Sequence, residues 1–459
     1  MELHELEITE VATLLRKRKV SPTELLAHTR ARIEQWNPIL NAYLSLREHA
    51  ARDAERAERA LRSRRPAHVL CGVPISIKDL ILSSDQLTTA GSRCFGDGMR
   101  SDHDAPVIRR LRRAGAVIVG RVNLHEVALG VTSVNEHFGP ARNPWNTSHV
   151  AGGSSGGSAV AVVAGLGAAS VGTDTRGSIR IPAACCGAVG LKPTRGLVST
   201  ADVIPLSPTL DTVGPITRSV TDAAAMLGGM AGTEEQAARW LRATRKRSSS
   251  LRIAISEYHL RDLDSEVQRA IDGALRVLRK VTRKVGQVRI AGIDAVQAAS
   301  VVITASEAFK YHQATLQQDP SAFGPLVRQR LEGGSAWRAV DYLNALETRR
   351  QFESSMSAVF QDVDVLIGAT IPALPPLIGA HAVQINGADA HTVDAFTRAN
   401  SPQNMAGTPA LSVPVGFSES GLPLAMQLLA GHGKEEHLFT IGSAFQRETD
   451  WHRRRPPLR

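Results

Sequence analysis

Two serine-bearing glycine loops lie close together in the sequence, at residues 152–158 and 172–182. A lysine, Lys78, ends an alternating apolar segment earlier in the chain. Such loops can bring a hydroxyl, backbone N–H donors and a base together, because no bulky side chains stand between them. The residue types therefore predict acyl-transfer chemistry by a hydrolase that uses serines and a lysine.

The first loop also matches Gly-x-Ser-x-Gly, the nucleophile elbow of α/β-hydrolases. That elbow requires a strand immediately before it, whereas residues 143–149 have the composition of a loop. A Ser–His–Asp triad would also need a downstream histidine, and His312, His381 and His432 have no distinctive sequence context. This interpretation is therefore disfavoured.

Phosphate binding and metal catalysis are two further alternatives for the glycine loops and the histidines. Neither loop contains the Gly-x-x-x-x-Gly-Lys-Ser/Thr pattern of a phosphate cradle. The dipeptides at 125–126 and 136–137 lack the His-Glu-x-x-His spacing of a zinc helix. We expect no metal and no cofactor.

The elements that must position these residues alternate between strands and helices. Residues 72–78 alternate like a strand with Lys78 at its end, and residues 157–167 form an Ala/Val-rich segment typical of a buried helix. Further expected elements are helices within 8–36, 50–62 and 105–114, strands at 116–120, 169–172, 363–367, 410–415 and 424–429, and a mainly helical segment between about 223 and 360. This rhythm predicts an α/β fold with a mixed sheet.

Composition limits the class of protein and its partners. The 459 residues carry 54 Lys and Arg against 44 Asp and Glu, a formal charge of +10, but the basic residues are scattered. The densest cluster, residues 242–252, has no interleaved aromatic residues to stack bases, so we expect no nucleic-acid partner. The four cysteines lack zinc spacing, and no signal peptide or run of about twenty apolar residues occurs. The expected location is the cytoplasm, without a membrane partner.

A long stretch of the chain resembles the amidase signature family of serine hydrolases. Residues 152–196 are similar to the signature sequence of that family, and the segments 143–145, 211–215, 406–410 and 421–423 fit the same pattern. The likeness runs from about residue 5 to 450 and is weakest between about 225 and 360. It implies a single large domain over residues 1–459, with a mixed central sheet flanked by helices and a more variable helical segment at about 225–360.

The resemblance assigns three catalytic roles. Ser178 matches the nucleophile that accepts the acyl group, Ser154 matches the bridging serine whose peptide bond is cis, and Lys78 matches the base. A hydroxyl is a weak nucleophile until a neighbouring group takes its proton. Because Lys78 can act as a base only when it is neutral, burial must lower its pKa.

The resemblance also implies the residues around the reacting carbonyl. Backbone N–H groups of Thr175, Arg176, Gly177 and Ser178 would stabilise the oxyanion, and the backbone of Ala128 would border the substrate. Asp174 and Arg180 would support this loop from behind. Regions 310–360 and 375–405 would line most of the pocket.

Arg176 departs from the family pattern, which usually has glycine at this position of the oxyanion loop. The backbone N–H survives the change, but the conformation that glycine permits is in question. The Arg176 side chain either points outward as a surface group or reaches into the cleft and selects an anionic or polar substrate.

The expected function is cofactor-free cleavage of amide C–N bonds through an acyl-enzyme. The family's range includes carbamates (urethanes) and esters, so a small-molecule amide or carbamate substrate is expected, and a homodimer is left open. The alternative is the amidase subunit of a tRNA-dependent amidotransferase, which releases ammonia from glutamine for a partner subunit.

Overall fold

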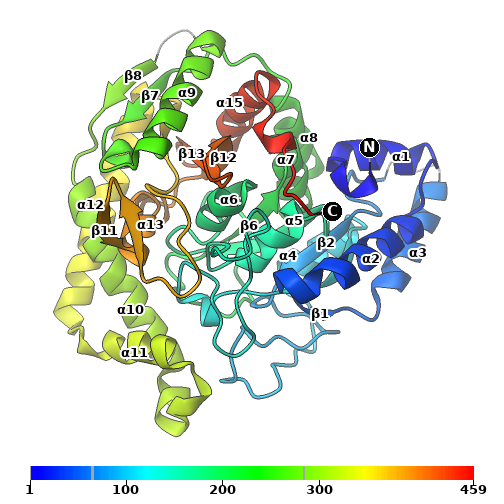
Figure 1. Ribbon diagram of the computed structural model, residues 1–459, viewed down its shortest axis with the longest axis horizontal. Helices are drawn as coiled ribbons and strands as arrows, with labels where there is room; N and C mark the ends of the chain where they lie inside the picture. The colour runs from blue at the N-terminus through cyan, green and yellow to red at the C-terminus, as the bar shows by residue number, and fades with distance from the viewer. Residues whose placement is uncertain (1, 64–66, 283–284, 459) are drawn as a thin grey trace.

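A mixed sheet of 11 strands runs through the centre of the computed structural model, which describes residues 2–63, 67–282 and 285–458 (Figure 1). In order across the sheet the strands are β1 (Tyr43–Leu46), β3 (Val117–Val122), β2 (Pro74–Lys78), β4 (Ala169–Asp174), β6 (Thr212–Thr217), β5 (Val189–Lys192), β12 (Ala410–Phe417), β13 (Pro423–Ala430), β9 (Val365–Ala369), β7 (Ile253–Ser256) and β8 (Val285–Val288). A separate hairpin consists of β10 (Ala382–Ile385) and β11 (Ala388–His391).

Two groups of parallel strands are joined by an antiparallel middle. Strand β2 pairs in parallel with both β3 and β4, and β7 pairs in parallel with β8 and β9. The strands from β4 through β6, β5, β12 and β13 to β9 pair antiparallel. The carboxyl ends of β2 and β4 therefore meet at one edge of the sheet.

Helices cover both faces of the sheet because successive strand residues point to opposite sides. In β3, Ile118 joins one apolar cluster while Val117 and Val119 join another. Helices over the first face are α1 (Ile8–Arg16), α4 (Pro106–Arg113), α7 (Val220–Met230), α8 (Glu234–Ala243), α9 (Ser265–Val281) and α15 (Glu435–Arg447). Helices over the second face are α2 (Pro22–Leu40), α3 (Ala50–Arg62), α5 (Gly156–Val163), α6 (Arg180–Cys186), α10 (Ile293–Gln318), α12 (Ala339–Asp362) and α14 (Ser401–Ala406).

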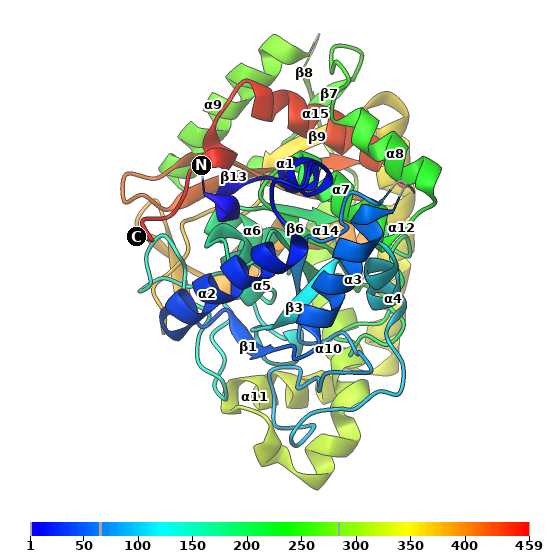
Figure 2. The same cartoon turned by 90° about the vertical axis from the view of Figure 1, so that its right-hand side faces the viewer.

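Two helices and several short turns complete the described chain. The helix α11 (Pro325–Gly333) lies with the end of α10 beyond the edge of the sheet in both views (Figures 1 and 2), and α13 (Thr392–Arg398) follows the β10–β11 hairpin. The 3₁₀ turns are η1 (Leu3–Glu5), η2 (Glu126–Ala128), η3 (Tyr258–Leu260), η4 (Pro320–Ala322), η5 (Gly334–Ala336) and η6 (Trp451–Arg453).

The predicted α/β fold class, with one mixed sheet flanked by helices in a single domain, is confirmed. The expectation of a mainly helical segment between about 223 and 360 is incomplete, because β7 and β8 extend one edge of the sheet. Val285 fits the apolar face of a helix by its spacing, yet α9 ends at Val281 and Val285 begins β8. Strands of four residues carry too few alternations to be separated from a preceding helix.

Candidate active site

Topology brings Lys78 and the second glycine loop to the same edge of the sheet. Lys78 is the last residue of β2, and the loop carrying Ser178 directly follows β4, the parallel neighbour of β2. The first glycine loop precedes α5, which packs against the second face. Residues separated by about 100 positions in the sequence therefore meet at one point.

Lys78 is fully buried and contacts two hydroxyls. Its Nζ lies 2.7 Å from Ser154 Oγ and 2.8 Å from Thr173 Oγ1. Burial lowers the pKa of Lys78 to about 7, although the nearby carboxylates of Asp211 and Asp174 favour the charged form. A substantial fraction of neutral amine is therefore present near neutral pH, as a base at this position requires.

Ser154 is held in a tightly packed loop. The Gly153–Ser154 peptide bond is cis, as the resemblance implies. The Ser154 carbonyl accepts hydrogen bonds from the backbone N–H of His125 at 3.0 Å and from Ser133 Oγ at 3.2 Å. A Cβ at Gly153 would lie 2.8 Å from the Ser133 backbone nitrogen, so only glycine allows this close approach.

Ser178 faces a cavity beside three unpaired backbone donors. Its side chain lines the cavity wall, and its Oγ has no hydrogen-bond partner within the described part of the chain. The backbone N–H groups of Thr175, Arg176 and Ser178 likewise lack an acceptor among the residues that the structure describes. Unpaired N–H groups in a largely buried loop are rare and are suited to an anionic ligand atom.

The expected donation by Gly177 to the oxyanion is not supported. Its N–H donates to Asp174 Oδ1 at 2.8 Å and is therefore already engaged. Gly177 has φ of 116°, and a Cβ there would lie 2.7 Å from Asn400 Cβ, so glycine is needed for the turn itself. Gly177 shapes the loop, whereas Arg176 adopts no left-handed backbone and fits without strain of that kind.

Asp174 and Arg180 lie behind the loop, as expected. Arg180 donates to both carboxylate oxygens of Asp174, at 3.0 and 3.1 Å, and both side chains are fully buried. Asp174 also accepts the N–H groups of Gly177 and Ile179. Burial alone would raise the pKa of Asp174, but Arg180, together with Lys192 and Asn404, outweighs burial and lowers the pKa to about 2.

Replacing Arg180 with methionine is expected to reduce the free energy of unfolding by about 3–5 kcal/mol, because Asp174 would keep a buried charge without its partner. Urea denaturation followed by circular dichroism measures the change. Arg350→Met, which removes an exposed partner of Glu347, is the matched control and should leave the unfolding midpoint nearly unchanged. Equal midpoints for the two variants would contradict the supporting role of Arg180.

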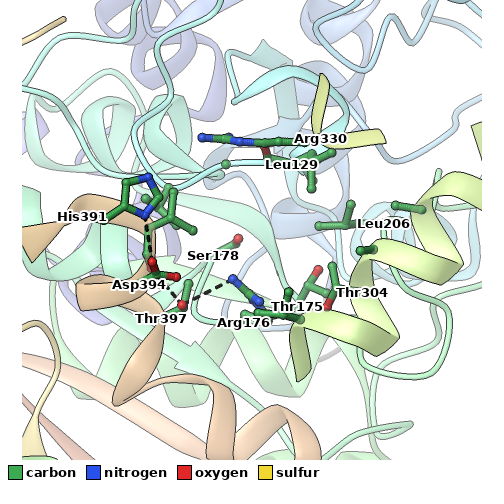
Figure 3. A pocket seen from close by; sticks show the side chains of 17 residues that line it. Leu129, Thr175, Arg176, Ser178, Leu206, Thr304, Arg330, His391, Asp394 and Thr397 are labelled. Carbon is green, nitrogen blue, oxygen red and sulfur yellow. Dashed lines mark hydrogen bonds and ion pairs between the residues drawn. The ribbon is translucent and has the colours of Figure 1, made fainter. Parts of the chain in front are cut away.

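A cavity of about 230 Å³ opens over Ser178 (Figure 3). Ala128 borders it as expected and has φ of 60°, a region that non-glycine residues seldom adopt. The Arg176 side chain lines the cavity and donates to Thr397 Oγ1 at 3.3 Å, so it does not point outward. The other lining residues include Leu129, Leu206, Val301, Thr304, Ala308, Arg330, His391 and Asp394.

Several residues of the site carry no recognisable sequence signal. Thr173, the second hydrogen-bond partner of Lys78, lies inside β4. It reaches Lys78 only because β2 is the neighbouring strand. Arg330 lines the cavity from the expected range of 310–360, and His391, Asp394 and Thr397 line it from the range of 375–405. The wall formed by residues 301–308 of α10 lies just before the first range. Arg330 and Asp394 could have been chosen as cavity residues only by knowing which helices cover the edge of the sheet.

Comparison with known proteins identifies the family. The family model described as Amidase matches residues 24–439, which is most of the chain. The chain belongs to the amidase signature family. It is therefore an amidase-family hydrolase, and the family resemblance of the glycine loops is confirmed by a match over residues 24–439.

The relatives of this amidase-family chain come from more than one kind of enzyme. It is 34% identical to a Glutamyl-tRNA(Gln) amidotransferase subunit of Geotalea daltonii over 495 residues, covering 100% of both chains. The solved structure of the same kind of subunit from Thermotoga maritima is 31% identical, with a TM-score of 0.82 over 98% of this chain and 96% of that one. A solved chain from a vestigial protein complex, described as revealing the origins of an s-triazine catabolic enzyme, is 30% identical, with a TM-score of 0.91 over 96% of this chain and 98% of that one.

The expectation that the chain meets only a small molecule, with no nucleic acid, is wrong. The full-length relatives are named as subunits of an amidotransferase for a charged tRNA, which implies partner subunits and tRNA. The expectation depended on scattered basic residues without interleaved aromatics. That pattern argues against base stacking on this chain, but it carries no information about a nucleic acid reached through another subunit.

Neither a membrane-spanning helix nor a metal-binding cluster is found among the described residues. None of the described helices has the length and apolar character needed to cross a membrane. Within residues 2–63, 67–282 and 285–458, no three His, Cys, Asp or Glu side chains converge on a point where a metal ion could bind.

Proposed function

We propose that this amidase-family chain releases ammonia from the carboxamide of glutamine, as the amidase subunit of a tRNA-dependent amidotransferase. The observation that carries the chemistry is the contact of buried Lys78 with Ser154 next to a cavity in which Ser178 lies beside unpaired N–H groups. Support for the assembly comes from the relatives named as amidotransferase subunits, which match over their whole length.

In the first half of the reaction, Ser178 Oγ forms a bond to the carbonyl carbon of the amide. Its proton passes to Ser154 while the proton of Ser154 passes to neutral Lys78. The negative charge on the carbonyl oxygen is stabilised by the N–H groups of Thr175, Arg176 and Ser178, and each such donor contributes about 3–4 kcal/mol to transition-state stabilisation.

The same proton path serves the departure of the leaving group. Lys78 returns its proton through Ser154 to the amide nitrogen, the C–N bond breaks, and ammonia leaves an acyl group on Ser178. Water then attacks the acyl carbon, gives its proton to the same relay, and releases the carboxylic acid. Ser154 therefore transfers a proton in each direction without forming a covalent bond to the substrate.

The assembly is tested by measuring ammonia release from glutamine in three mixtures: the chain alone, the chain with its copurifying subunits, and those subunits with glutamyl-tRNA. We expect about tenfold stimulation in the complete mixture, the size of a typical coupling between sites. Formation of glutaminyl-tRNA is followed in parallel, with the Ser178→Ala assembly as control. Ammonia release that is equal in all three mixtures, without amide formation on tRNA, would contradict the amidotransferase assignment.

A further inference from the structure

Arg176 presents a guanidinium to the cavity without a carboxylate to neutralise it. Its hydrogen-bond partner is the hydroxyl of Thr397, at 3.3 Å, and it forms no ion pair with the residues described. Thr397 is itself fixed, since it accepts from Gln297 Nε2 at 3.1 Å and donates to the Val393 carbonyl at 2.8 Å. The guanidinium is thus positioned by neutral groups and keeps its charge available.

A second guanidinium comes from the opposite wall of the cavity (Figure 3). Arg330, on α11, donates to the Leu129 carbonyl at 2.9 Å and likewise has no carboxylate partner in the described chain. Burial lowers the pKa of Arg176 to about 10, against a favourable contribution of Asp394, so Arg176 stays protonated at neutral pH. Two like charges that face one cavity are unfavourable unless an anion joins them.

The remaining groups around the two arginines also suit an anion. Thr304 lies on α10 in the cavity wall, 6% exposed, and its Oγ1 has no hydrogen-bond partner among the described residues. The acidic group on this wall, Asp394, is bound to His391 Nδ1 at 2.9 Å and its side chain is 68% exposed, so it lies toward solvent. The interior of the cavity is therefore cationic, with an unpaired hydroxyl donor.

We propose that Arg176 selects amides whose acyl part carries a carboxylate, with Arg330 and Thr304 completing the anion subsite. This inference rests on the proposed attack by Ser178 and narrows its substrate class. Because Arg176 is two residues from Ser178, the carboxylate lies a short chain away from the carbonyl under attack, as in the monoamide of a short dicarboxylic acid. A neutral amide would leave both guanidiniums desolvated and unpaired, which disfavours its binding.

The test uses labelling of Ser178 by an uncharged fluorophosphonate, because this readout does not depend on the true substrate. Glutarate, which has a carboxylate at each end, should protect Ser178 in the full chain at concentrations about 30-fold lower than valeramide, an uncharged amide of the same length. In Arg176→Met the ratio of the protecting concentration of valeramide to that of glutarate should fall about tenfold or more. Arg176→Lys should restore part of this ratio. Each ratio is measured within one variant, so a changed labelling rate does not affect it.

Arg328→Met is the matched control, because it removes one positive charge from the exposed side of the same helix as Arg330. It should keep the wild-type ratio. Equal protection by glutarate and valeramide in the wild type, or an unchanged ratio in Arg176→Met, would overturn the anion subsite while leaving the hydrolase assignment intact. Failure of the probe to label Ser178 in the folded wild type would instead overturn the proposed function on which the inference rests.

Discussion

Ser178→Ala is expected to lower kcat by at least about 10⁴-fold, because the variant has no group that can form the acyl-enzyme. The protein should remain folded, since the Ser178 hydroxyl makes no hydrogen bond to the described residues and its backbone carbonyl still accepts from Ser155. Turnover of glutamine, or of the amide found to react best, is measured on the purified variant. Fluorophosphonate labelling followed by peptide mapping should give an adduct on Ser178 in the wild type and none in the variant.

Ser158→Ala is the matched control for this experiment. Ser158 lies in the first turn of α5 and is fully buried, and its hydroxyl donates to the Val171 carbonyl at 3.4 Å, away from the cavity. The same loss of one hydroxyl there should change kcat by less than about tenfold, because it removes only one weak hydrogen bond. Wild-type turnover in Ser178→Ala would disprove the nucleophile assignment, and an adduct on Ser154 would show that the two serines have exchanged roles.

Much of the fold around the site could be predicted from local sequence patterns. The alternation of residues 72–78 placed Lys78 at the end of a strand, and the Ala/Val-rich segment after residue 156 gave the buried helix α5. These elements are buried on both sides, so their apolar composition directly predicts a buried strand and a buried helix. The strands β7 and β8 were missed because each has only four residues and because Val285, the first residue of β8, continues the apolar spacing of α9.

The site itself was only partly predictable, for a different reason. The two glycine loops contain the serine hydroxyls and backbone N–H groups that acyl transfer needs. The family resemblance pointed to Lys78, Ser154 and Ser178. No motif marks Thr173, Thr304 or Arg330. Each reaches the site only because the fold packs its strand or helix beside the reacting residues. The engagement of Gly177 with Asp174 depends on the exact path of one turn, which spacing alone does not fix.

Lys78→Met is expected to lower the rate of Ser178 labelling by about 10²–10⁴-fold, the range for loss of a general base. Its pH dependence gives a sharper test, because the base must be neutral. In the wild type, with a pKa of Lys78 of about 7, the rate should rise about tenfold per pH unit below 7 and level off above it. Lys78→Met should lose this rise, since no amine remains to titrate beside Ser154.

Lys192 provides the matched control for Lys78→Met. It is a second fully buried lysine, burial lowers its pKa to about 7 as well, and its Nζ donates to the Pro193 carbonyl at 2.9 Å instead of contacting Ser154. Lys192→Met repeats the same substitution with the same loss of a buried amine, and it should keep the rise of the rate toward pH 7. Asp211, whose pKa burial raises to about 6, titrates nearby, so Asp211→Asn is included and should retain a rise in rate with pH. If the rise of the labelling rate with pH persists in Lys78→Met but is lost in Lys192→Met or Asp211→Asn, Lys78 is not the base.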